Sequence, residues 1–272
     1  MPPEGPGRER RERAPLGLWL AAALLAVYVA LPLATLLWAL APAELGRHLA
    51  SPLALRALRL TLQTTFVATL LAVALGTPLA LLLARAEFRG REALDTLIDL
   101  PITIPPVVAG VALLLAFGRR GLVGRYLDVM GVQVAFSAVA VVMAQLFIAS
   151  PFFVKAARAG FEAVDPTLEA AARTLGAGRW RVFWTVTVPL ARPALLSGVV
   201  LAWARALSEF GATMMFAGNF PGRTQTLPLA VMTAMESDLE TAIAVSAVSL
   251  ALALLALLAA KWLAGRWRTP NA

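Results

Sequence analysis

Polar side chains that could do chemistry interrupt one apolar run of this sequence, residues 190–216. They are Ser197, Arg205, Glu209 and Thr213, which recur at multiples of four residues, together with Ser208. This spacing predicts one polar stripe along a helix, because residues four apart lie on the same face. A charge at the centre of a membrane-spanning helix costs about 2.5–3.5 kcal/mol on insertion scales. The stripe should therefore face the interior of a helix bundle.

Two functions fit this stripe. As the lining of an anion pathway, Arg205 would attract the anion, and the hydroxyl groups would donate hydrogen bonds to it. As a packing device, Arg205 and Glu209 would form an ion pair within or between helices. A fully neutralised arginine attracts an anion weakly, and this favours the ion pair.

Few other residues suit catalysis or metal binding. The sequence has no cysteine and one histidine, which excludes disulfides and thiolate metal sites. The apolar runs contain no paired aspartates, no His-Glu cluster and no Ser-His arrangement, which argues against an intramembrane enzyme. A secondary transporter is another alternative, but no repeat between the two halves is evident. We expect no catalytic residue, metal or cofactor on this chain.

The composition is that of a membrane protein. Of the 272 residues, 60% are hydrophobic and 15% are charged, whereas soluble domains average roughly 45–50% and about 25%. The formal net charge is +8, and the arginines flank apolar runs, which indicates membrane orientation and lipid contact and argues against nucleic acid as a partner. The predicted fold class is all-α and polytopic.

Six apolar runs are each close to the ~20 residues that cross a bilayer. They cover residues 16–40, 60–84, 98–117, 132–154, 190–216 and 241–264. The third contains Pro101, Pro105 and Pro106, which predict either a kinked entry or a gate that lines a pathway. The Gly76-Thr77-Pro78 sequence in the second run predicts a packing kink.

The basic residues orient these spans. With the N-terminus inside, the inner segments hold 16 Lys and Arg residues and the outer loops hold 7. The positive-inside rule therefore predicts that both termini are cytoplasmic. Residues 1–15 should form a disordered basic cytoplasmic tail, residues 16–54 the first span with an outer loop, and residues 266–272 a second cytoplasmic tail.

The loop between the fourth and fifth spans is polar and cytoplasmic in this orientation. Asp165 can cap a helix that starts with Pro166, and Gly176 can end it. Between them lie three small residues, Ala170, Ala171 and Ala172. A small-faced helix that is followed by a glycine predicts a surface for another protein.

This loop, residues 156–189, resembles the EAA loop of ABC importer permeases. The pattern of that family is E-A-A, three residues, G, nine residues, I, one residue, L-P. Gly176 and Pro189 match its glycine and proline, and the three alanines then occupy the E-A-A positions. The glutamate position is therefore Ala170, and Glu169 lies one place earlier, about 100° round the helix.

The resemblance implies a permease domain over residues 55–265. It implies that the loop forms a coupling helix docked on a separate ATP-binding cassette subunit, where ATP is hydrolysed. Consistent with this, the chain has no G-x-x-x-x-G-K-[ST] phosphate loop. It further implies a homodimer in the inner (cytoplasmic) membrane, alternating access, and an extracytoplasmic substrate-binding protein.

A second resemblance concerns the substrate. Residues 203–242 read WARALSEFGATMMFAGNFPGRTQTLPLAVMTAMESDLETA, and residues 100–110 read LPITIPPVVAG. Both are similar to molybdate importer permeases. Sulfate and thiosulfate permeases share the EFGA and TQT elements, while FAGN and TLPLA favour molybdate; tungstate is an alternative of nearly the same size.

The outer segment 218–228 is polar and rich in turn residues. It contains Asn219, Arg223, Thr224 and Gln225. By the same resemblance, it helps to form the face that receives the substrate-loaded binding protein, and a plain connecting loop is the alternative.

Overall fold

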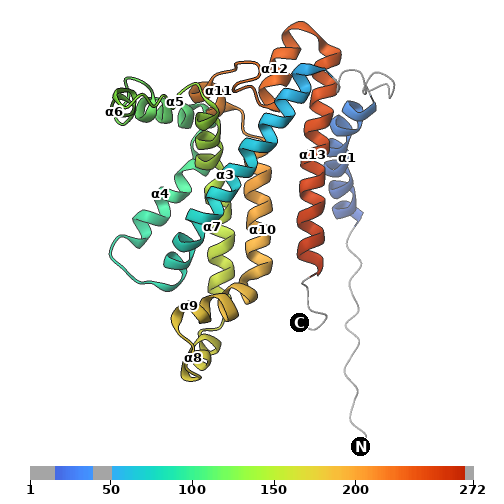
Figure 1. Cartoon of the computed structure of the whole chain (residues 1–272). Helices are drawn as coiled ribbons and strands as arrows, with labels where there is room; N and C mark the ends of the chain where they lie inside the picture. Colours follow the sequence, from blue (N-terminus) through green and yellow to red (C-terminus); the bar gives the residue numbers. More distant parts are fainter. Residues whose placement is uncertain (1–15, 39–50, 267–272) are drawn as a thin grey trace, which may run out of the picture.

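The computed structural model describes residues 16–38 and 51–266, and all the regular elements it assigns there are helical (Figure 1). The long helices are α1 (Leu16–Trp38), α3 (Pro52–Arg85), α7 (Ala138–Glu162), α10 (Val188–Leu207) and α13 (Leu239–Arg266). The shorter ones are α4 (Arg91–Thr103), α5 (Pro106–Phe117), α6 (Gly124–Val129), α8 (Pro166–Thr174), α9 (Arg179–Val182), the π-helix η1 (Phe183–Thr187), α11 (Gly211–Ala217) and α12 (Leu227–Ser237). The predicted all-α class is confirmed.

Five of the described helical segments are long and apolar enough to cross a membrane. They are Leu16–Trp38, Pro52–Arg85, Ala138–Glu162, Arg179–Leu207 and Leu239–Ala259. The pair α4 and α5 makes a sixth if it is counted as one broken span. The six predicted apolar runs therefore correspond to five long helical segments and one broken pair.

The third predicted span is not one helix. Helix α4 ends at Thr103, α5 starts at Pro106, and the two are bent by 117°. Ile104 and Pro105 between them have extended backbone angles. Proline supplies no N–H group and disfavours helical geometry in the residue before it, so two consecutive prolines end α4. The predicted disturbance at the prolines is confirmed, although the broken span begins at Arg91 and not near residue 98; its role as a gate stays a prediction.

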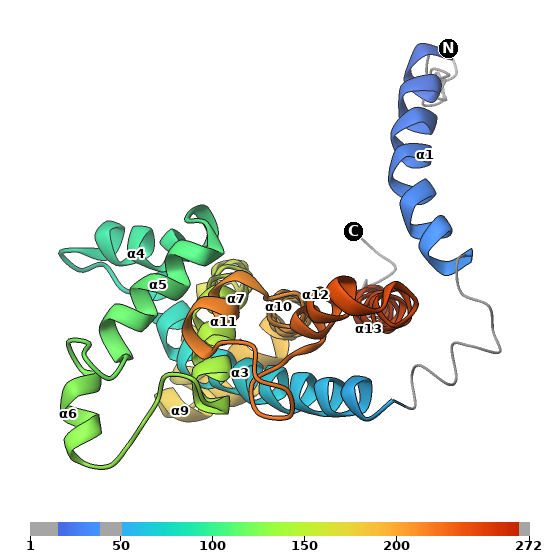
Figure 2. The same cartoon turned by 90° about the horizontal axis from the view of Figure 1, so that it is seen from above.

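The fifth predicted span begins and ends earlier than expected, because the helical segment that can cross a membrane is Arg179–Leu207. Helix α10 ends at Leu207, and α11 follows after a break at residues 208–210. The chain then turns and forms α12, which sequence reasoning missed. Helix α11 packs against α5 and α7, and α12 packs against α13 and α3 (Figure 2). The run 190–216 therefore contains a span and a separate short helix.

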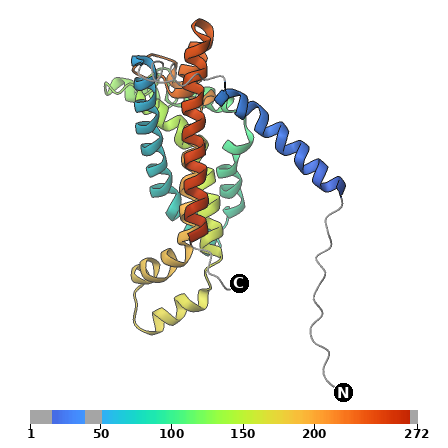
Figure 3. The same cartoon turned by 90° about the vertical axis from the view of Figure 1, so that its right-hand side faces the viewer.

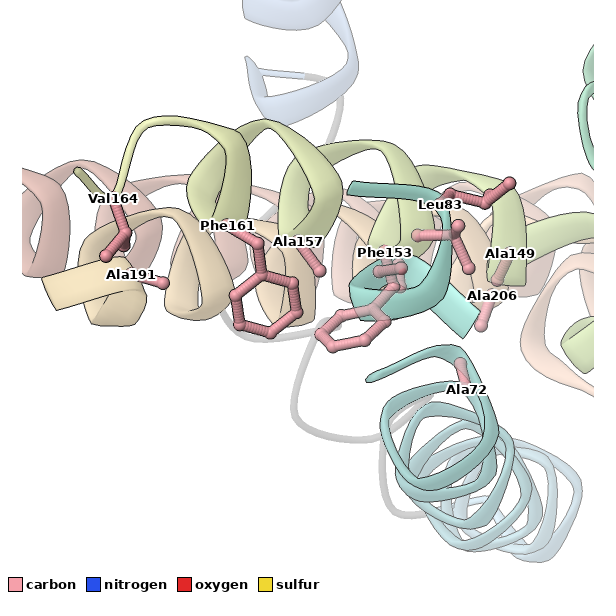
Figure 4. Close-up of a cluster of buried hydrophobic side chains, with 12 residues drawn as sticks. Ala72, Leu83, Ala149, Phe153, Ala157, Phe161, Val164, Ala191 and Ala206 are labelled. Atoms are coloured by element: carbon pink, nitrogen blue, oxygen red, sulfur yellow. The ribbon is translucent and has the colours of Figure 1, made fainter. Parts of the chain in front are cut away.

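Helix α7 lies at the centre of the bundle, and its contacts with α3 and α10 are the most extensive between described elements. Figure 4 shows Phe153 and Phe161 of α7 among alanines from the neighbouring helices. Helix α3 continues through Pro78, and a Cβ atom at Gly76 would lie 2.7 Å from the Phe153 ring. Small residues thus let the helices approach, and Gly76 has a packing role.

Different short helices lie at the two ends of the bundle. Helices α8 and α9 lie at one end, and α13 finishes near that end (Figures 1 and 3). Helices α5, α6, α11 and α12 lie at the opposite end. Helix α1 approaches α13 only near the C-terminal end of α1, slants away from the bundle and has no buried residue (Figures 2 and 3). The predicted tail at residues 1–15, most of the predicted outer loop (39–50) and residues 267–272 lie outside the described residues.

Candidate functional site

Helix α8 begins as the sequence predicted. Asp165 is its N-cap, and its carboxylate accepts a hydrogen bond of 2.8 Å from the Thr167 N–H group. Pro166 occupies the first helical position, where its missing N–H group costs nothing. Hydrogen bonds from Thr167, first through the backbone and then through the side chain, lower the pKa of the exposed Asp165 carboxyl group. The cap is therefore ionised at neutral pH, which suits the positive end of the helix dipole.

Helix α8 ends at a glycine hinge. Gly176 has a φ angle of +85°, in the left-handed region where glycine carries no Cβ penalty. The Gly176 N–H donates to the carbonyl of Arg173, and the Ala177 N–H donates to that of Ala172. Nothing lies within 4 Å of the position that a Cβ atom at Gly176 would take. Glycine is therefore required here by backbone conformation and not by crowding.

One face of α8 is uncovered in the isolated chain. Ala170 and Ala171 are exposed and Ala172 is half-buried. Leu168 and Leu175 are also exposed, the latter by 89%. At 100° per residue, Leu168, Ala171 and Leu175 lie on one face of the helix, while Ala170 lies on another side. The first three make a short apolar surface that a partner protein can approach closely. That this helix is a surface for another protein stays a prediction.

The Glu169 side chain is buried against the rest of the chain, unlike the exposed side chains of Ala170 and Ala171. It is 8% exposed, and its Oε1 accepts hydrogen bonds from Arg85 Nη2 at 3.0 Å and from Thr187 Oγ1 at 2.8 Å. Arg173 Nη2 lies 3.6 Å from its Oε2. Arg85 also donates to the carbonyl of Val164, just before the helix cap. Glu169 is thus an internal anchor of α8 and is not on the alanine face.

Sequence reasoning missed Arg85 and Thr187 as site residues. Arg85 is the last residue of α3, and Thr187 ends the π-helix that leads into α10. The sequence offered two weak signals for them: Arg85 is a basic residue at the end of an apolar run, and Thr187 carries a hydroxyl two residues before Pro189. Neither signal predicts that the side chain would contact Glu169. Pro189, which was among the predicted loop residues, is exposed.

An aromatic cluster follows the glycine hinge. Trp180 stacks on Phe183 with ring centroids 5.7 Å apart, and Trp184 meets Phe183 edge-on at 5.1 Å. Trp180 and Trp184 remain exposed at the start of the candidate span Arg179–Leu207. Tryptophan is enriched at such membrane–water boundaries.

Arg205 and Glu209 form the ion pair that the sequence allowed. Arg205 Nη2 lies 2.9 Å from Glu209 Oε2, and the Glu209 side chain is fully buried. The other carboxylate oxygen accepts a hydrogen bond of 2.8 Å from the Ala212 N–H. Glu209 therefore satisfies a free donor in the first turn of α11 and neutralises Arg205. This geometry favours the packing role of the pair.

The polar stripe itself is interrupted. Because α10 ends at Leu207, Thr213 belongs to α11 and does not continue the α10 face. Ser197 is half-buried, Ser208 is exposed, and Thr213 is buried with no hydrogen-bond partner among the described side chains and backbone. The prediction of one continuous stripe was wrong, since Ser208 and the capping carboxylate of Glu209 interrupt the helix.

The segment 218–226 folds back on itself. The Gln225 amide donates to Asn219 and to Thr233 of α12, and the Thr224 hydroxyl accepts from the Phe220 N–H. Thr224 is 0% and Gln225 is 2% exposed. Their side chains brace the loop, so the prediction that they present an outer face was wrong. Of the four predicted residues, Arg223 is exposed and Asn219 is half-buried.

Comparison with protein families identifies the class of the chain. The sequence matches the family described as "Binding-protein-dependent transport system inner membrane component" over residues 72–269, which includes the whole of α8 and α10. The chain belongs to this family. It is a membrane permease component of a transport system, and the resemblance to importer permeases stated above is confirmed.

Two curated relatives bear on the substrate. The molybdenum transport system permease protein of Mycobacterium tuberculosis is 43% identical over 232 residues, which cover 85% of this chain and 88% of that protein. A chloroplastic sulfate permease of Chlamydomonas reinhardtii is 44% identical over 208 residues, which cover 76% of this chain and 56% of that protein.

Among solved structures, a bacterial ABC transporter that imports the acidic polysaccharide alginate has a similar fold. The TM-score is 0.71, with 18% identity, 92% of this chain and 96% of that chain covered. At this identity the likeness establishes the fold alone. The permease therefore has the helical architecture of ABC importer membrane subunits.

Proposed function

We propose that this chain is the permease subunit of an ATP-driven importer that moves molybdate into the cell. The observation that carries the proposal is α8, a capped helix with an exposed small-residue face at the E-A-A register, set between spans of a family member. Molybdate is favoured by the FAGN and TLPLA elements and by the mycobacterial relative. Sulfate is the second candidate, because a sulfate permease is equally identical over a comparable stretch.

The position of α8 orients the permease in the membrane. An ATPase subunit would dock on the exposed residues Ala170 and Ala171. That subunit would bind and hydrolyse ATP, and this chain would carry no cofactor. That end of the bundle is then cytoplasmic, which agrees with the excess of basic residues in the segments assigned to the inside. Because α13 finishes near that end (Figure 1), the end of α13 at Arg266 would be on the cytoplasmic side as well.

The opposite end would receive the binding protein. Helices α6 and α12 and the loop around Arg223 lie there. A single subunit provides half of a pathway, so two copies would enclose the route of the anion. Specificity would reside mainly in the binding protein, and the permease needs only a path that tolerates a small oxyanion.

Competition for uptake tests the substrate. Cells that express the permease with its cognate ATPase and binding protein would be given labelled molybdate and an excess of unlabelled molybdate, tungstate or sulfate. We expect molybdate and tungstate to compete strongly and sulfate weakly. Competition by sulfate as strong as that by unlabelled molybdate would favour the sulfate group, and the same cells without the permease provide the baseline.

A further inference from the structure

We propose that Glu169 is a positioning residue that links the coupling helix to two membrane spans at once, to α3 through Arg85 and to α10 through Thr187. The inference rests on the proposed function, because it concerns how movement of α8 would reach the pathway. It assigns Glu169 to the inside of the permease and leaves docking to the alanine face.

The chain bends at both ends of α8. On the C-terminal side, it leaves α8 through a turn at Gly176, which has a left-handed backbone. On the N-terminal side, Asp165 has an extended backbone and contacts its own helix. A rigid helix between two bends needs a side contact if its displacement is to move its neighbours.

Packing does not supply that contact on the side of α3. A cavity of about 730 Å³ is lined by Ala84 and Arg85 of α3, by Pro166 and Glu169 of α8, and by Thr187 of η1. Both members of the ion pair line this space, with Arg85 Nη2 3.0 Å from Glu169 Oε1. The link between α8 and the end of α3 is therefore polar and directional.

The charges and helix ends suit the link. Arg85 lies in the last turn of α3, where a cation is favoured by the helix dipole, and Glu169 lies in the first turn of α8, where an anion is favoured. Arg85 Nη2 also donates to the carbonyl of Val164 at 3.0 Å. One guanidinium thus contacts both the segment before α8 and the helix itself.

The third member of the link is placed by an unusual turn. Residues Phe183–Thr187 form a π-helix, a form that is rare and concentrated at functional sites. Thr187 is 3% exposed, and its hydroxyl donates to Glu169 at 2.8 Å. Because Thr187 runs directly into α10, displacement of Glu169 would act on that span without passing through the glycine hinge.

Thr187 gives the sharpest test, because its burial keeps it away from any docked partner. The assay is the number of molybdate ions moved per ATP hydrolysed, in proteoliposomes that contain the permease, its ATPase and its binding protein. Thr187→Val keeps the shape and removes the hydroxyl. Thr187→Ser keeps the hydroxyl. Thr185→Val is the matched control, because Thr185 is exposed and its hydroxyl donates to the carbonyl of Arg181.

We expect Thr187→Val to lower transport per ATP by about fivefold or more, the lower range of allosteric couplings, with ATPase binding unchanged. Thr187→Ser and Thr185→Val should behave as the unmodified protein. Arg85→Gln, with exposed Arg89→Gln as its control, provides a second variant if Thr187→Val does not assemble. Unchanged coupling in the assembled variant, or a loss of ATPase binding that accounts for lost transport, would overturn the proposal. Failure of the unmodified complex to move molybdate would instead contradict the proposed function.

Discussion

Glu169 and Ala170 are neighbours in α8, yet their side chains meet opposite surroundings. Glu169 is 8% exposed and contacts three side chains of this chain, whereas Ala170 is exposed. The glutamate has therefore not taken over the position that the importer family fills with an acidic residue. The partner ATPase would meet alanine methyl groups and backbone at this register.

Close approach by a partner should be blocked by a large side chain on this face. Ala171→Trp is expected to weaken binding of the cognate ATPase by at least about tenfold, which corresponds to about 1.4 kcal/mol. Ala93→Trp is the matched control, because Ala93 is an exposed alanine on α4. Co-purification of the two subunits at graded ATPase concentrations measures the effect. Equal loss in both variants would show a general defect.

The glycine hinge should respond to backbone conformation and not to side-chain size. Gly176→Val places a side chain on a left-handed backbone, which costs about 1–2 kcal/mol. Gly176→Asn should cost less, because asparagine tolerates that conformation. Thermal unfolding of the purified permease and its binding to the ATPase are the measurements. If both substitutions had the same effect, the hinge would depend on space around residue 176.

Substitutions of Arg205 and Glu209 can distinguish a packing role of this ion pair from a role in the anion pathway. Arg205→Ala leaves a buried carboxylate unpaired and should destabilise the permease by about 1–3 kcal/mol, a value reduced because Arg205 is partly exposed. Adding Glu209→Gln removes that charge and keeps an acceptor for the Ala212 N–H group.

A packing role predicts that the double variant regains both thermal stability and molybdate uptake. A pathway role predicts that it regains stability but not uptake. Melting in detergent and uptake by cells, measured on the same three proteins, decide between the two.

The contact between Gly76 and Phe153 should be sensitive to added volume. A Cβ atom at residue 76 would lie 2.7 Å from the Phe153 ring and 3.1 Å from Val154. Gly76→Leu is expected to separate α3 from α7 and to cost about 1–3 kcal/mol. Phe153→Leu in the same chain should restore part of the loss. No change in melting temperature with Gly76→Leu would contradict the packing described for α3.

Local signals explain what could be predicted from the sequence. The start and end of α8 depend on Asp165, Pro166 and Gly176, whose effects act within one turn, and the spans follow from their apolar length. The partners of Glu169 could not be predicted, because Arg85 is 84 residues away in the chain. Which basic side chain pairs with Glu169 depends on how the helices pack.

The breaks in two spans show the same limit. Pro105 and Pro106 signalled a disturbance, but a bend of 117° depends on where α5 finds a surface to pack on, and that surface is α11. Glu209 was predicted to pair with Arg205, yet its second contact with the Ala212 N–H group marks the start of a new helix. Periodicity alone cannot separate a polar stripe from a capping residue.

We propose that this permease moves molybdate when an ATPase acts through α8. The proposal is tested by ATP-dependent accumulation of labelled molybdate in proteoliposomes with the cognate ATPase and binding protein, with and without residues 169–176 of the permease. We expect accumulation with the intact chain, and loss of both accumulation and ATPase binding after the deletion, with the spans still inserted. Retained ATPase binding by the deleted chain, or no accumulation by the intact complex, would contradict it.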